Sequence, residues 1–196
     1  MIFKQKPTYD FIIAGLGNPG LQYEKTRHNV GFMAVDLLAE NEKFSFNKNK
    51  YDALLGEWKL NDKRILVIKP QTFMNCSGNA VSKIVNFYKI PTDRVIVLHD
   101  DISLDVGKIR MRRKGSDGGQ RGMRDIIELL GTDNIMRIKI GVGAKPHPDY
   151  DLKDWVLGKF PENQKEDLKK ALDKSVSALK EIVLKGIDSA MNKYNN

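Results

Sequence analysis

The sequence predicts a single-domain α/β protein with a three-layer architecture, in which a central mixed, twisted sheet is flanked by helices. Short apolar runs typical of buried strands alternate along the chain with longer segments whose apolar residues recur at helical spacing. The length of 196 residues suits one compact domain that spans 1–196, with a full core.

The first half of the chain contains the clearest strands and two helices. Each strand is a short run of mostly apolar residues, and each helix has apolar residues every three or four positions. Pro70 closes one of the strands and Pro91 closes one of the helices. The strands are predicted at 11–14, 53–60, 64–68 and 94–98, and the helices at 30–40 and 75–88.

The second half begins with a strand of strict alternation. Over residues 108–113, Ile109 and Met111 fall on one face and basic residues fall on the other. This pattern predicts a half-buried strand with a basic outer face. Three further elements follow: a helix at 118–130, a strand at 137–142 and a long amphipathic helix at 164–194 with a bend at Gly186.

The composition favours a cytoplasmic protein with an anionic partner. The 33 Lys and Arg residues outnumber the 25 Asp and Glu residues, for a formal net charge of +8. No apolar run approaches the roughly 18 residues of a membrane span, and residues 1–10 lack the apolar core of a secretory signal. The lone cysteine, Cys76, excludes an internal disulfide and a multi-cysteine zinc site.

The segment GLGNPG at 15–20 follows a predicted strand and matches the dinucleotide-binding fingerprint. That fingerprint requires a helix to begin at once, so that its N-terminus can hold a pyrophosphate. Here Pro19 lies inside the motif and a polar stretch, 22–29, follows it. We therefore favour a tight turn that presents Asn18 at the carboxyl end of the strand, with nucleotide binding as the alternative.

Three histidines are candidates for acid–base chemistry. His147 lies between two prolines in a loop and is expected to be solvated, whereas His99 ends a strand, where an imidazole is as often structural as catalytic. His28 has polar neighbours on both sides and follows the glycine turn. It is a candidate general base, and a role at the start of a helix is the alternative.

Asp100 and Asp101 follow the strand at 94–98, so at least one of them should emerge at the ligand-binding edge of the sheet. A carboxylate there can orient a histidine ring and stabilise its protonated form. Two alternatives remain: a metal site built from Asp100, Asp101 and Asp105, and a turn with solvated acids.

Asn75 precedes a predicted helix and has two possible roles. It can be the N-cap of that helix, or its amide can donate to a substrate carbonyl or a developing oxyanion. A serine nucleophile is not indicated, because no Gly-x-Ser-x-Gly motif occurs, and Cys76 has no obvious base beside it. Water activated by a histidine is then the simplest hydrolytic scheme.

Basic residues concentrate between positions 108 and 124, where Asp117 is the single acid. The glycine-rich loop at 115–119 leads into a helix N-terminus, an arrangement that suits phosphate. Aromatic residues are not interleaved, so contact with an RNA backbone is favoured over base stacking, and over a merely solvated face. The basic residues are Lys108, Arg110, Arg112, Arg113, Lys114, Arg121 and Arg124.

Taken together, these segments resemble the bacterial-type peptidyl-tRNA hydrolase family over nearly the whole chain. The landmarks are GLGNPG at 15–20, Tyr23, TRHN at 26–29, TFMNCSG at 72–78, HD at 99–100 and VLGK at 156–159. The resemblance implies a cytoplasmic, monomeric hydrolase of translation that cleaves the ester between a peptidyl group and the 3′ end of tRNA. It implies no metal, no cofactor, no membrane and no protein partner.

The resemblance also implies roles for individual residues. His28 would be the general base that activates water, and Asp100 would hold its ring. Asn18 and Asn75 would bind the peptidyl part and steady the attacked carbonyl. Further implied contacts are a cleft lined by Tyr23, Phe73 and Met74, and a clamp on the terminal phosphate of tRNA by Arg112 and Lys139, with Arg110 and Lys108 on the same basic strand region.

The chain departs from the family pattern at Gln120 and Arg121, where His-Asn is common, and at Ser103, where an acid is common. The role of that asparagine in placing water and substrate does not transfer to Arg121. A guanidinium there is expected to contact the substrate instead, by stabilising negative charge or meeting a phosphate. The departure leaves one rival: a non-catalytic RNA binder, as in plastid intron-splicing proteins that share this fold.

Overall fold

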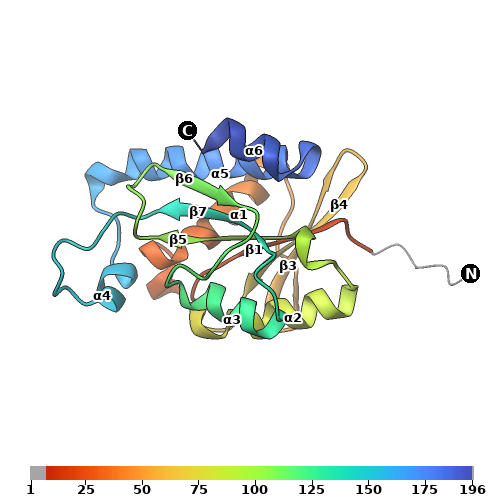
Figure 1. Ribbon diagram of the computed structural model, residues 1–196, viewed down its shortest axis with the longest axis horizontal. Helices are drawn as coiled ribbons and strands as arrows, with labels where there is room; N and C mark the ends of the chain where they lie inside the picture. The colour runs from red at the N-terminus through yellow and green to blue at the C-terminus, as the bar shows by residue number, and fades with distance from the viewer. Residues whose placement is uncertain (1–7, 196) are drawn as a thin grey trace, which may run out of the picture.

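The strands of the protein form one seven-stranded sheet with the order β2-β3-β4-β1-β5-β7-β6 (Figure 1). The structure, a computed structural model, describes residues 8–195. The strands are β1 (Phe11–Gly15), β2 (Lys48–Lys50), β3 (Ala53–Leu60), β4 (Lys63–Pro70), β5 (Val95–Asp101), β6 (Ile109–Arg112) and β7 (Met136–Gly141).

Four neighbouring strands, β4, β1, β5 and β7, run parallel to one another. β2, β3 and β6 run antiparallel to their neighbours, so the sheet is mixed, as predicted. The carboxyl ends of the parallel strands meet at one edge of the sheet. The glycine turn after β1, the Asn75 segment after β4 and the acidic pair at the end of β5 therefore gather at that edge.

Helices cover both faces of the sheet and confirm the three predicted layers (Figure 1). On one face, α1, α5 and α6 share a core with Ile13, Ile96 and Ile138; on the other, α2 and α3 pack with Ile12 and Val97. A strand such as β1 supplies both cores because its side chains alternate. The helices are α1 (Val30–Glu42), α2 (Ser77–Tyr88), α3 (Arg121–Leu130), α4 (Leu152–Leu157), α5 (Lys165–Lys185) and α6 (Ile187–Tyr194).

Two predicted helices differ from the structure at their glycines. The bend expected within 164–194 is a full break, because Gly186 has a φ of +89° and separates α5 from α6. The helix expected at 118–130 begins only at Arg121. Gly118 and Gly119, at the start of the predicted range, have positive φ, and Gln120 is the N-cap that starts the helix.

Two short elements were not predicted. β2 consists of three exposed polar residues without an apolar pattern, and it is a strand because it pairs with β3. α4 lies between the predicted strand at 137–142 and the predicted helix at 164–194, and the side chain of Asp151 caps it by accepting from Lys153 N. The alternation predicted for β6 is confirmed, since Ile109 and Met111 are buried between exposed arginines.

Gly31, in the first turn of α1, allows an unusually close approach of helix and sheet. A Cβ at this position would lie 2.4 Å from Leu16 N and 2.4 Å from Leu98 O. Only glycine lets the first turn of α1 lie against the ends of β1 and β5. The turn that precedes α1, which carries His28, is thereby held at the carboxyl edge of the sheet.

Among residues 8–195, no helix is long and apolar enough to cross a membrane. The prediction made for residues 1–10 falls mainly on 1–7, which lie outside the described residues.

Candidate active site

A cleft of about 550 Å³ opens at the carboxyl edge of the parallel strands. Its walls come from the glycine turn after β1, the 3-10 turns η2 (Arg27–Asn29) and η3 (Met74–Cys76), the end of β5, the start of α3, and α4. All the predicted catalytic and substrate-binding residues line it: Asn18, Tyr23, His28, Phe73, Met74, Asn75, Asp100 and Arg121.

His28 and Asp100 meet in this cleft although 72 residues separate them in the sequence. The Nδ1 atom of His28 lies 2.8 Å from Oδ2 of Asp100. The carboxylate side chain is only 4% exposed, and the imidazole is 14% exposed. When Nδ1–H donates to the carboxylate, Nε2 carries the lone pair and can accept a proton. The pair therefore has the form of an oriented general base.

The glycine turn is locked beside His28 by a reciprocal pair of hydrogen bonds. Asn29 Oδ1 accepts from Asn18 N, and Asn29 Nδ2 donates to Asn18 O, both at 2.9 Å. The side chain of Asn18 accepts from Met74 N through Oδ1 at 2.8 Å. Its amide nitrogen is left as a donor in a cleft-lining side chain. Asn29 was named in the sequence only as part of a motif, and the structure shows that this buried residue, directly after His28, ties the glycine turn to the turn that carries the imidazole.

The dinucleotide-binding alternative lacks its essential helix. The chain after 15–20 forms only the short 3-10 turn η1 (Leu21–Tyr23), and α1 begins later, at Val30. A pyrophosphate would find no helix N-terminus at the glycine turn. The tight turn that presents Asn18 at the end of β1 is confirmed.

Asn75 is not an N-cap. It lies inside η3, and α2 begins at Ser77 after Cys76, whose side chain makes no capping bond. Asn75 is exposed at the cleft, and its carboxamide makes no hydrogen bond to any residue of 8–195. The amide is therefore available to a ligand. Phe73, 59% exposed, stands at the same rim.

The other two histidines are placed as the sequence suggested. His147 is exposed in a loop. His99 is buried, and its Nδ1 lies 2.7 Å from the carbonyl oxygen of Asp100. Burial lowers the pKa of His99, because the charged ring would be cut off from water. His99 is a neutral structural group in the wall of the cleft.

The carboxylates at the end of β5 and in the turn that follows do not assemble a metal site. Within the part of the chain that the structure describes, no group of three His, Cys, Asp or Glu side chains is arranged to hold a metal ion. Asp101 instead pairs with Lys139 at 2.9 Å and accepts from Ser103. Burial alone would raise the pKa of Asp101, but the hydrogen bonds from Ser103 and Lys139 outweigh it and lower the pKa.

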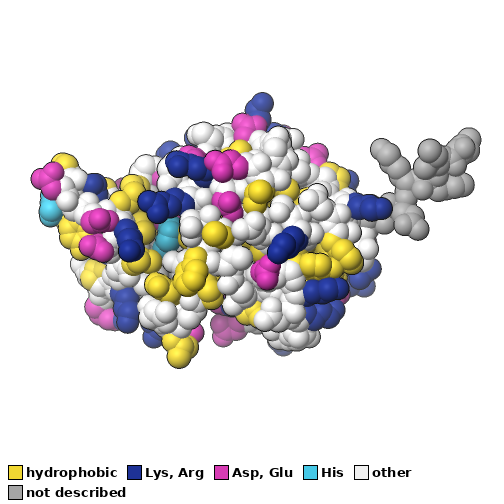
Figure 2. All heavy atoms as spheres, turned by 90° about the horizontal axis from the view of Figure 1, so that it is seen from below, with side chains coloured by type: hydrophobic (Ala, Val, Ile, Leu, Met, Phe, Trp, Pro, Cys, Tyr) yellow, Lys and Arg dark blue, Asp and Glu magenta, His cyan; other side chains and the backbone are white. Residues whose placement is uncertain are grey.

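Four basic side chains share one face of β6 and β7, the face toward α3. Arg110 pairs in register with Lys139, and Arg112 pairs with Arg137. Arg110 and Arg112 are exposed and form no ion pair with any described residue, whereas Lys139 is tied to Asp101. Figure 2 views the molecule from below and shows Lys and Arg side chains mixed with acidic and hydrophobic ones toward the end that carries α4.

Arg137 was not singled out in the sequence. Its position explains how the glycine-rich loop at 115–119 is held in place. Its buried guanidinium donates to Gly115 O and Ser116 O at 2.6 and 2.8 Å. Burial lowers the pKa of this arginine. The carbonyl bonds hold the loop at 115–119 over the basic face, where a Cβ on Gly118 would lie 3.1 Å from Lys139 Nζ.

Comparison with known proteins decides the family. The family model described as peptidyl-tRNA hydrolase matches residues 12–196. The chain belongs to the peptidyl-tRNA hydrolase family. A peptidyl-tRNA hydrolase from Thermoanaerobacter sp. (strain X514) is 49% identical over 185 residues, which cover 94% of this chain and 99% of that protein.

A second sequence and a crystal structure from the peptidyl-tRNA hydrolase family are also similar to this chain over most of its length. The protein of Clostridium botulinum (strain Alaska E43 / Type E3) is 44% identical over 94% of this chain and 95% of its own length. The crystal structure of peptidyl-tRNA hydrolase from Acinetobacter baumannii has a TM-score of 0.89 at 33% identity and covers 94% of both chains. The resemblance and the fold class inferred from the sequence are thereby confirmed.

This member of the peptidyl-tRNA hydrolase family holds α4 against the site through Arg27. The guanidinium lies 3.6 Å from the ring centre of Trp155 and 5.2 Å from that of Phe160. It also donates to Trp155 O and Lys159 O. Arg27 precedes His28, so the same turn carries the imidazole and anchors the α4 wall. The motif at 26–29 contained this residue, but its stacking role depends on a segment over 120 positions away.

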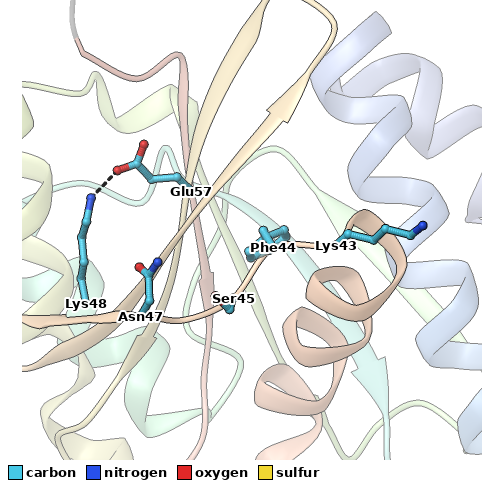
Figure 3. Close-up of a pocket in the computed structure, with 6 residues that line it drawn as sticks. All are labelled: Lys43, Phe44, Ser45, Asn47, Lys48 and Glu57. Carbon is cyan, nitrogen blue, oxygen red and sulfur yellow. Dashed lines mark hydrogen bonds and ion pairs between the residues drawn. The ribbon is translucent and has the colours of Figure 1, made fainter.

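A second pocket of this family member lies outside the active site (Figure 3). It is lined by Lys43, Phe44, Ser45 and Asn47 and by the ion pair of Lys48 with Glu57, whose Nζ–Oε1 distance is 2.6 Å. Figure 3 shows Lys43 extending away from that pair. The charged groups do not converge on a common point, so the pocket offers no catalytic arrangement.

Proposed function

We propose that this chain hydrolyses the ester between a peptidyl group and the 3′ end of tRNA, by attack of a water molecule that His28 activates. The observation that carries the proposal is the 2.8 Å contact between His28 Nδ1 and Asp100 in a cleft that also holds the amides of Asn18 and Asn75. Membership of the peptidyl-tRNA hydrolase family supports the substrate and the reaction.

In the proposed reaction, His28 Nε2 takes a proton from water as the water oxygen attacks the ester carbonyl carbon. The carboxylate of Asp100 stabilises the resulting imidazolium. Negative charge on the carbonyl oxygen is met by amide donors, Asn75 among them. The bond between the carbonyl carbon and the ribose oxygen then breaks, and the imidazolium gives its proton to that oxygen, which leaves as the ribose hydroxyl.

The substrate contacts follow from exposure and charge. We assign the peptidyl side to the cleft rim at Tyr23, Phe73 and Met74, and a phosphate or developing charge to Arg121. Exposed guanidinium groups suit the tRNA phosphates best. The proposed phosphate contacts are Arg112, Arg110, Lys108 and Lys139, the last of which also keeps its ion pair with Asp101. The scheme needs no metal, cofactor or protein partner, and we expect a monomer that works in the cytoplasm.

The assay is release of a labelled N-acyl-amino acid from tRNA, with and without chelator. We expect equal release in both conditions, since the proposed nucleophile is activated by imidazole alone. Loss of release on chelation would revive the metal site of aspartates. No release in either condition, with tRNA still bound, would instead identify the chain as a non-catalytic RNA binder.

Replacing Arg112 with alanine tests the phosphate contacts. We expect KM to rise about 10-fold with kcat nearly unchanged, because a charged hydrogen bond to tRNA is lost in substrate and transition state alike. The slope of log KM against log salt should fall by about 1. Arg113→Ala is the matched control, since Arg113 is already paired with Asp188. An unchanged salt slope in Arg112→Ala would remove Arg112 from the clamp.

A further inference from the structure

Gln120 is the second partner of the carboxylate that holds His28. Its Nε2 donates to Asp100 Oδ1 at 3.1 Å, while Asp100 Oδ2 faces His28. Both oxygens of the carboxylate are therefore engaged, one by an amide and one by an imidazole. Rotation of the carboxylate would break both contacts, so Gln120 restricts the direction in which Asp100 presents its charge.

The orientation of the Gln120 amide is set by its other contacts. Its Oε1 accepts from Met123 N at 2.7 Å and caps α3, and its Nε2 also lies 3.0 Å from Met74 Sδ. Turning the amide over would place its oxygen against the Asp100 carboxylate and its NH2 group against a backbone donor. The residue is 7% exposed, so water does not readily replace these bonds.

We propose that Gln120 is a positioning residue for the reaction: through a non-titrating N–H donor it keeps Asp100 directed at His28. The inference rests on the proposed function, in which His28 is the base. An amide gains and loses no proton in the working pH range, so this support is constant with pH. The titratable or charged groups that line the same cleft are Tyr23, His28, His99, Asp101, Arg121, Asp151 and Lys153, and Lys139 pairs with Asp101.

Gln120→Glu separates positioning from helix capping. The introduced carboxylate keeps an acceptor for Met123 N at a helix N-terminus, where negative charge is favourable, so the helix cap is retained. It loses the donor and repels Asp100. We expect kcat at neutral pH to fall about 10- to 100-fold with KM within about 2-fold, because the base is misdirected and the substrate contacts remain.

The pH profile of this variant gives the readout that capping alone does not predict. The carboxyl group that Gln120→Glu introduces lies beside Asp100. Repulsion between the two carboxylates favours uptake of one proton by the pair, so the pKa of the introduced group rises above its usual value of about 4.3. As the pH is lowered toward about 5, that proton restores a hydrogen bond to Asp100. The ratio of Gln120→Glu to wild-type kcat should therefore rise. A capping role predicts no rise, since protonation weakens the cap.

Two further measurements complete the test. Gln120→Met removes both the cap and the donor, so it should lower the melting temperature and kcat with no recovery at low pH.

Long-range ¹H–¹⁵N spectra of the His28 ring should show the Nδ1–H tautomer in the wild type and a mixture in Gln120→Glu at neutral pH. This spectrum does not depend on turnover, so it remains decisive even if His28 is not the base. Wild-type kcat in Gln120→Glu, a ratio that is constant with pH, or an unchanged tautomer would overturn the proposal.

Discussion

His28→Ala is expected to lower kcat by about 10²- to 10⁴-fold, the range that a positioned general base contributes. The loss follows because neither of the other histidines can replace His28: His99 is buried with its Nδ1 on a carbonyl oxygen, and His147 is exposed and lies outside the cleft lining. Binding of tRNA should stay close to that of the wild type, since the basic face on β6 and β7 is untouched. Single-turnover release and equilibrium binding measure the two effects separately.

His147→Ala is the matched control for this prediction. It removes an exposed imidazole that contacts only Tyr150 among the aromatic rings, so turnover should stay at the wild-type level. Turnover of His28→Ala within about 10-fold of the wild type would contradict the base assignment. A loss that small is less than the contribution expected of a general base.

Asp100→Asn is expected to lower kcat by up to about 10⁴-fold, the upper end of the loss expected for His28→Ala and the size of the same change in the serine protease triad. The arrangement around residue 100 explains why the loss should be large. Gln120 Nε2 requires an acceptor at Oδ1, so the new amide must turn its NH2 group toward His28. Nδ1 then becomes the acceptor and Nε2 carries the hydrogen, so the ring cannot take a proton from water. KM should change little.

Asp105→Asn is the control for the aspartate substitution. Asp105 is exposed and lies outside the cleft lining, so its loss should leave kcat unchanged under the histidine scheme. If Asp100 and Asp105 held a metal instead, both substitutions would lower kcat and added divalent cation would partly restore it. Full activity in Asp100→Asn would show that the carboxylate does not orient the base.

Much of the fold could be predicted because strands buried on both faces are short apolar runs, while amphipathic helices repeat their apolar residues with a period of 3.6. β1, β5 and α2 were placed from such patterns, and β6 from its alternation. The elements that were missed have no period of their own. β2 is an exposed three-residue strand that exists by pairing with β3, and α4 is a short helix held by Arg27 from a distant part of the chain.

The candidate residues were predictable by type and by position at strand ends, but their partners were not. Asp100 and Asp101 are neighbours in the sequence with the same chemistry. Successive side chains of a strand point to opposite faces, so Asp100 turns to His28 while Asp101 turns to Lys139. The sequence also marked Gln120 only as a departure from a family pattern, since its contacts lie on β5 and η3.

The sequence by itself determined the α/β class, the family, the basic strand and the histidine, carboxylate and carboxamide groups from which the site is built. These features follow from the composition, from the spacing of apolar residues and from short motifs, all of which depend on residues that are close together in the sequence. The tertiary structure decided which carboxylate meets His28, that Lys139 is paired with Asp101, and that Gln120 reaches Asp100. Such contacts depend on strand register and on close approaches such as that at Gly31, which set distances between segments that are far apart in the chain.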